Sequence, residues 1–123
     1  MCEFVNFLIA KKLKEKGFDK YCCRAYNEIG CFNDTDTYKY SGEFYCYAPQ
    51  ISQVLKWLRD EKKMHIEIFL YNGAYSYFVK SITKICEDDW FHQCLNEDIA
   101  DLKYVSYELA TLAGIEYIID NLI

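Results

Sequence analysis

The sequence predicts an α+β fold in which two to three amphipathic helices pack on one face of an antiparallel sheet. Three observations support this class: an Asn-Gly pair inside a strand-like stretch at 65–80, apolar stripes at helical spacing elsewhere, and no alternation of strands and helices of the parallel βαβ kind. The chain has 123 residues, of which 52% are hydrophobic, and no linker or repeat divides it. We therefore expect a single domain over residues 1–123.

The first predicted element is a helix over residues 3–16. Its apolar positions recur at helical spacing and form one stripe, made of Val5, Leu8, Ile9 and Leu13. Lysines load its last turns, where cations suit the helix dipole. Gly17 follows as the expected left-handed cap, and Phe18 is expected to pack back onto the last turn.

The next segments are rich in aromatic residues and in turn formers. Residues 21–28 suit a strand, and residues 29–37 contain Gly, Asn and Asp, which predict a loop. Residues 38–47 place aromatic residues around Ser41-Gly42, which fits either one bent strand or a tight hairpin.

A second helix is predicted to open at Pro49, since proline is tolerated in a first helical turn. Its apolar stripe consists of Ile51, Val54, Leu55 and Leu58, with Trp57 at the edge.

The strongest signal is a β-hairpin over residues 65–80. Asn72-Gly73 separates two strand-like runs, and a two-residue loop of this type fixes one register. The predicted pairs are Tyr71 with Ala74, Leu70 with Tyr75, Ile68 with Tyr77, and Ile66 with Val79. The face expected toward the core therefore holds Ile66, Ile68, Leu70, Tyr75, Tyr77 and Val79.

Residues 83–103 are polar and acidic, and they fit either a loop with a short helix or an irregular strand. A last helix is predicted over 107–122, with Ser106 as its N-cap. Its apolar face is expected along Leu109, Leu112, Ala113, Glu116 and Ile119, widened by Ala110, Tyr117 and Ile118. Gly114 lacks a side chain, so the helix is expected to approach the sheet closely there.

Composition and motifs exclude several function classes. A net charge of −5 argues against general nucleic-acid binding, which needs Lys and Arg to offset phosphate charge. No dinucleotide-binding or P-loop motif occurs, no apolar run approaches the ~20 residues of a membrane span, and the N-terminal pattern is not that of a signal peptide. We therefore expect a cytoplasmic chain without a cofactor, whose seven cysteines are reduced.

Several segments resemble a family of small uncharacterised proteins from phages and mobile elements of gut Bacteroidetes. The resemblance covers nearly the whole chain in order, with matching stretches at 12–19, 46–49, 53–60 and 65–68. In the closing helix the matching positions are Tyr107, Ala110, Ala113-Gly114-Ile115 and Leu122-Ile123. Within them, Lys56-Trp57-Leu58-Arg59 is the most specific motif and Ala113-Gly114-Ile115 is less so. The family implies an accessory role and brings no catalytic residues. Relatives carry Thr after the Ala-Pro pair, where this chain has Gln50, a poorer cap, so the helix is expected to fray or to use Ser52.

Aromatic residues make up 18% of the chain, and 12 are Tyr, which is too many to hide in one small core. Tyr suits interfaces because it buries a large area and keeps a polar tip. We therefore expect a non-enzymatic interaction module that binds a protein partner or a second copy of itself. The expected interaction surface is Tyr38, Tyr40, Tyr45, Phe69, Tyr71 and Phe78.

Two other functions stay open at this point. Cys86, His92 and Cys94 could serve a small metal- or thiol-dependent enzyme, although their spacing matches no standard zinc template. Residues 80–123 carry three basic and nine acidic residues, so the carboxylates of 87–101 could instead imitate DNA phosphates in an inhibitor.

Overall fold

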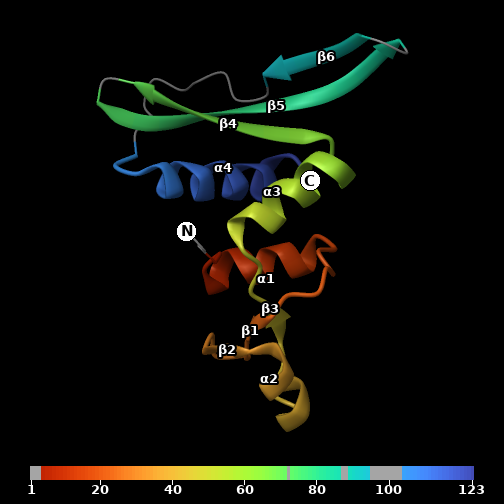
Figure 1. Ribbon diagram of the computed structural model, residues 1–123, viewed down its shortest axis with the longest axis vertical. Helices are drawn as coiled ribbons and strands as arrows, with labels where there is room; N and C mark the ends of the chain where they lie inside the picture. The colour runs from red at the N-terminus through yellow and green to blue at the C-terminus, as the bar shows by residue number, and fades with distance from the viewer. Residues whose placement is uncertain (1–3, 72, 87–88, 95–103) are drawn as a thin grey trace. The chain divides into compact units, whose positions relative to one another are not determined.

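The computed structural model describes residues 4–71, 73–86, 89–94 and 104–123, and it describes side chains in these ranges outside residues 71, 82–86 and 89–94. Helices and two antiparallel sheets confirm the predicted α+β class. The expectation of one sheet is wrong, because the described strands form two separate three-stranded ladders, β2-β1-β3 and β4-β5-β6. The chain divides into two compact units, residues 1–53 and 54–123 (Figure 1).

The first unit opens with α1 (Phe7–Glu15), which begins later than the predicted residue 3. The delay has a local cause, since the Asn6 side chain accepts a hydrogen bond from the Ile9 N–H at 2.9 Å and caps the helix. Upstream of the cap, Phe4 forms an antiparallel bridge with Gln50 instead of joining the helix.

The core side of α1 differs from the predicted stripe. Ile9, Ala10 and Leu13 of the helix are buried, as is Val5 before it, but Leu8 is 54% exposed and does not belong to the buried stripe. Gly17 has a φ of 92°, and the Phe18 N–H donates to the Leu13 carbonyl at 3.0 Å, which confirms the predicted glycine cap. Phe18 is buried as expected.

The small sheet of the first unit is built on β1 (Arg24–Tyr26), which pairs with β2 (Phe32–Asp34) on one side and with β3 (Cys46–Tyr47) on the other. The strand predicted over 21–28 is therefore present only over its middle residues. The Tyr26 hydroxyl donates to the Val5 carbonyl at 2.7 Å and ties this sheet to the start of the chain.

A helix, α2 (Thr35–Ser41), lies where a loop over 29–37 and a strand or hairpin over 38–47 were expected, so both predictions are wrong over this stretch. Thr35 is fully buried, and its hydroxyl donates to the Cys22 carbonyl at 2.6 Å. Tyr38, three residues on, is buried too, so the inward side of the segment has a helical period. Gly42 ends the helix in the left-handed conformation at φ 78°.

The next helix, α3 (Ile51–Glu61), begins two residues after Pro49. The Pro49 carbonyl accepts a hydrogen bond from the Val5 N–H at 3.0 Å, which keeps this residue outside the helix. The weak cap at Gln50 is compensated by Gln53, whose side-chain oxygen accepts from the Gln50 N–H at 3.1 Å. The predicted stripe is confirmed by burial at Ile51, Val54 and Leu58, with Trp57 buried beside it.

The second unit contains the predicted hairpin, formed by β4 (Met64–Tyr71) and β5 (Ala74–Cys86). All four predicted pairs are observed. The second strand runs further than expected and pairs with β6 (Asp89–Cys94). The undecided segment 83–103 is thus strand over 83–86 and 89–94, and its other residues lie outside the described ranges.

The predicted core face of the hairpin is confirmed at Ile66, Tyr77 and Val79, which are buried. Leu70 is 65% exposed, so its predicted burial is wrong. It lies on the edge strand near the turn, opposite Tyr75.

The last helix, α4 (Tyr107–Asn121), runs along one face of the β4–β5 ribbon (Figure 1). Ser106 caps it as predicted, accepting from the Leu109 N–H at 3.1 Å. The predicted face is rotated, since Leu109 is 48% exposed while the buried residues are Ala110, Thr111, Gly114, Ile115, Ile118 and Ile119. The helix is apolar around most of its circumference, so periodicity alone did not identify the side that meets the sheet.

Removing either of two buried hydroxyls in this unit should change the free energy of unfolding, in opposite directions for the two. Within the described residues, the Ser76 hydroxyl is buried without a hydrogen-bond partner, whereas the Thr111 hydroxyl donates to the Tyr107 carbonyl at 2.9 Å. We expect Ser76→Ala to raise the free energy of unfolding by up to about 1 kcal/mol, because an unsatisfied buried polar group is costly. Thr111→Val should lower it by about 1 kcal/mol. Urea denaturation measures both changes. A loss of stability in Ser76→Ala would contradict the conclusion that the Ser76 hydroxyl is buried without a hydrogen-bond partner.

Candidate binding site

The segment Phe44–Tyr47 carries aromatic side chains on the surface of the first unit, and we call it the aromatic strip. The sequence holds it in place from both ends. The left-handed Gly42 turns the chain out of α2, and the Phe44 N–H donates to the Tyr38 carbonyl at 3.2 Å. The Tyr45 N–H then donates to the Tyr26 carbonyl at 3.1 Å, which fixes the strip on the edge of β1.

A lysine from α1 lies against this strip. The Lys14 ammonium donates to the Tyr45 carbonyl at 2.8 Å and lies 4.1 Å from the centre of the Tyr45 ring. A cation at this distance from a ring face is attracted by its quadrupole. Lys14 forms no ion pair with any residue that the structure describes. Because an ammonium has three donors, two remain for a ligand.

A cavity of about 360 Å³ opens between the last turns of α1 and the aromatic strip. This volume falls in the usual range of ligand sites, which is roughly 300–1,000 Å³. Its walls are mostly rings and small apolar groups, with one cation and one carboxylate among them. The residues that line it are Ala10, Lys14, Gly17, Phe18, Asp19, Phe44, Tyr45, Cys46 and Tyr47.

A second lysine lies on the other side of the strip. The Lys39 ammonium, from α2, donates to the Tyr47 hydroxyl at 2.8 Å, and this hydrogen bond raises the pKa of Lys39. Three rings surround that ammonium, with centres 5.7 Å away for Tyr21, 5.2 Å for Phe44 and 5.1 Å for Tyr47. The strip therefore lies between two cations drawn from different helices.

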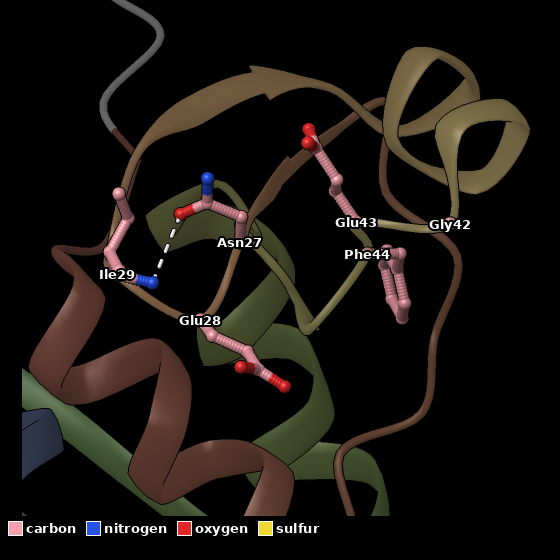
Figure 2. A pocket seen from close by; sticks show the side chains of 6 residues that line it. All are labelled: Asn27, Glu28, Ile29, Gly42, Glu43 and Phe44. Carbon is pink, nitrogen blue, oxygen red and sulfur yellow. Dashed lines mark hydrogen bonds between the residues drawn. The ribbon is translucent and has the colours of Figure 1, made fainter.

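A second hollow, of about 310 Å³, lies between the β1–β2 loop and the α2–β3 loop (Figure 2). Glu28 lines this hollow from the first loop and Glu43 from the second, where Phe44 lies beside it. Asn27 stiffens the first loop, since its side-chain oxygen accepts from the N–H groups of Ile29 at 3.1 Å and Cys31 at 2.8 Å. This hollow is acidic, whereas the cavity beside α1 combines rings with Lys14.

The residues expected to form the interaction surface are divided between the two units and differ in burial. Tyr38 is only 5% exposed and donates to the Cys31 carbonyl, so it belongs to the core of the first unit. Tyr40 is 96% exposed, and Tyr45 lines the cavity beside α1. Phe69 and Phe78 stack on each other at 4.6 Å in the second unit, and the side chain of Tyr71 lies outside those described.

Sequence reasoning missed the two lysines of the site and three of its rings, Tyr21, Phe44 and Tyr47. The sequence pattern indicates only that Lys14 suits the helix dipole, and it assigns no role to Lys39. Tyr21 and Tyr47 belong to stretches that are rich in aromatic residues, but no local pattern showed that they flank a single ammonium.

The side chains of Cys86, His92 and Cys94 are not among those described. The backbone register pairs Cys86 with Asp89, His92 with Ile82, and Cys94 with Lys80, which places Cys86 and Cys94 at opposite ends of the β5–β6 ladder. Among the side chains that are described, no three His, Cys, Asp or Glu residues gather in a way that could hold a metal ion. The carboxylates of 87–101 likewise lie outside the described side chains.

The four cysteines with described side chains are free thiols, and two of them are buried. Burial raises the pKa of Cys22 to about 11 and the pKa of Cys46 to about 11. Because the thiolate is the nucleophile, these two thiols are poorly suited to nucleophilic chemistry near neutral pH.

No family model, curated protein or solved structure matches the chain. Within the ranges that the structure describes, every helix is too short or too polar to span a bilayer.

Proposed function

We propose that the chain is a non-enzymatic interaction module that binds a short acidic segment of a partner protein in the cavity between α1 and the aromatic strip. The observation that carries the proposal is the cavity itself, in which aromatic walls surround an ammonium with spare donors. An apolar side chain of the partner fills the ring-lined space, and a neighbouring carboxylate meets Lys14.

The wider biological role in this proposal is accessory. The resemblance of Lys56-Trp57-Leu58-Arg59 and of the closing helix to small phage and mobile-element proteins of gut Bacteroidetes supports a role in the cytoplasm of a bacterial host. No catalytic step is part of the proposal, and the partner is a protein rather than a nucleic acid.

Selection from a displayed peptide library tests this function. Peptides retained by the full-length protein are expected to carry Asp or Glu beside an aromatic or branched apolar residue. Lys14→Glu replaces the attraction between Lys14 and the peptide carboxylate with a repulsion. It should therefore weaken binding of the best peptide about tenfold or more, which corresponds to a loss of about 1.4 kcal/mol or more in binding free energy. Fluorescence anisotropy with a labelled peptide gives both dissociation constants.

Lys11→Glu is the matched control, because Lys11 is an exposed residue of the same helix that does not line the cavity. It changes the net charge equally and should leave the affinity within about twofold. Equal losses in the two variants would show a general charge effect and would contradict the proposal. Light scattering of the purified protein tests for self-association. If the wild-type protein is a dimer and Lys14→Glu is a monomer, the occupant of the cavity is a second copy of the chain and not a partner peptide.

A further inference from the structure

The three rings around Lys39 form an aromatic cage, defined here as Tyr21, Phe44 and Tyr47. The middle ring, Tyr47, stands nearly perpendicular to both of its neighbours, at 66° to Phe44 with centres 4.9 Å apart and at 68° to Tyr21 with centres 5.9 Å apart. The Lys39 ammonium meets Tyr47 at its hydroxyl edge, 2.8 Å from that oxygen, and lies beside the rings of Tyr21 and Phe44. The ammonium of Lys39 lies within 6 Å of all three ring centres.

The surroundings of the cage favour a positive occupant. The Tyr21 hydroxyl donates to the Asp36 carboxylate at 3.2 Å, so a negative charge is fixed beside one wall. Asp36 lies on the same helix as Lys39 and adds to the potential that this ammonium experiences. Ring quadrupoles and a carboxylate together attract cations and repel anions.

Lys39 is a weak occupant for such a site. Its side chain is exposed, and its ammonium makes a single hydrogen bond, to Tyr47, with no ion pair among the described residues. A primary ammonium is strongly hydrated, and confining a lysine side chain costs up to about 2 kcal/mol of rotamer entropy. A quaternary ammonium has no N–H groups, so it loses less when it leaves water, and its methyl groups fill the space between rings.

We propose that the aromatic cage of Tyr21, Phe44 and Tyr47 is a binding site for a quaternary ammonium group, and that Lys39 is an internal occupant which this ligand displaces. The inference goes beyond the proposed function, because its ligand is a cation and because Tyr21 and Lys39 do not line the cavity that contains Lys14, although Phe44 and Tyr47 line both sites. The ligand group can belong to a trimethylated lysine of a protein or to a small molecule of the choline type, and the two share the same chemistry.

Titration with choline, followed by the ring signals of Tyr and Phe in NMR spectra, tests the site. We expect wild-type protein to bind choline weakly and Lys39→Ala to bind it at least tenfold more tightly, since the internal competitor is gone. The neutral analogue of choline, in which a tert-butyl carbon replaces the nitrogen, should bind at least tenfold more weakly than choline. Equal affinity for the two compounds, or no binding of choline by Lys39→Ala, would overturn the proposal.

Second substitutions in the Lys39→Ala background locate the ligand. Adding Tyr21→Ala should abolish choline binding, whereas adding Tyr40→Ala should not, because Tyr40 is an exposed tyrosine of α2 that makes no ring or cation contact with the side chains that the structure describes. If Tyr40→Ala weakens binding as much as Tyr21→Ala, the cage is not the site. Thermal unfolding of each variant confirms that the first unit stays folded.

Two further arms separate this inference from the proposed function and identify the source of the cation. Adding Lys14→Gln, which introduces no negative charge, should leave choline binding within about twofold while it weakens peptide binding, so the two sites fail separately. A peptide with trimethyl-lysine is then compared with choline. Tighter binding of the peptide assigns the group to a protein, and tighter binding of choline assigns it to a small molecule.

Discussion

Replacing Gly114 with leucine is expected to lower the free energy of unfolding by about 3 kcal/mol, because the side chain would overfill the contact between α4 and the sheet. A Cβ built at Gly114 would lie 2.9 Å from Cγ2 of Ile66 and 3.3 Å from Cδ2 of Tyr77, and both residues are buried. The expected fall in melting temperature is about 10 °C for a chain of this size. Thermal and urea denaturation measure these changes.

A smaller substitution at the same position tests whether the contact with Ile66 causes the loss of stability. Gly114→Ala should lower stability, although helix propensity alone favours alanine over glycine by about 1 kcal/mol. Ile66→Ala removes both of the Ile66 methyl groups that lie near the built Cβ. In that background, Gly114→Ala is therefore expected to raise stability by up to about 1 kcal/mol. The same sign in both backgrounds would show that Ile66 does not limit the approach of the helix.

The hairpin shows what the sequence could establish. A two-residue Asn-Gly loop leaves the flanking strands one register, so the pairs of β4 with β5 followed from local chemistry alone. The caps at Gly17 and Ser106 were predicted for the same reason, since each depends on residues within one helical turn.

The helix α2 shows where local reasoning failed. Aromatic residues at 38 and 40 follow the two-residue period of a strand, and this period suggested the wrong element. The decisive interaction joins the Thr35 hydroxyl to the carbonyl of Cys22, 13 residues earlier. No pattern within a single segment reveals such a bond, so the helix could not be predicted from its own residues.

Of the candidate site, only the presence of exposed aromatic rings could be predicted. The excess of tyrosine correctly suggested exposed rings, and Tyr45 was among the residues expected. The chemistry of the site depends on Lys14 lying against Tyr45, 31 residues away, and on Lys39 lying among rings from two other segments. Both lysines occupy helix surfaces where a solvated charge is the ordinary expectation, so only the tertiary structure distinguishes them.

Raising the pH from about 8 to about 10.5 is expected to lower the free energy of unfolding by about 4 kcal/mol through two buried thiols. Burial raises the pKa of Cys22 and of Cys46 from 9.0 to about 11 in the folded protein. Above pH 9 the unfolded thiols lose their protons while the folded ones keep theirs, so the unfolded state binds fewer protons. Stability from these groups is therefore complete below pH 9 and is lost as the pH rises toward 11.

Urea denaturation at both pH values, with a reductant present, measures this loss. Cys46→Ala should remove about half of the pH-dependent change, because each thiol contributes about 2 kcal/mol at the upper pH. Cys31→Ala is the matched control, since that side chain is exposed and does not contribute to the raised pKa of Cys22 or of Cys46, and it should leave the slope unchanged. Burial also raises the pKa of Tyr77, to about 12, so stability should continue to fall beyond the thiol range. A slope that is the same in wild type and in Cys46→Ala would show that this thiol is not protected from ionisation by the fold.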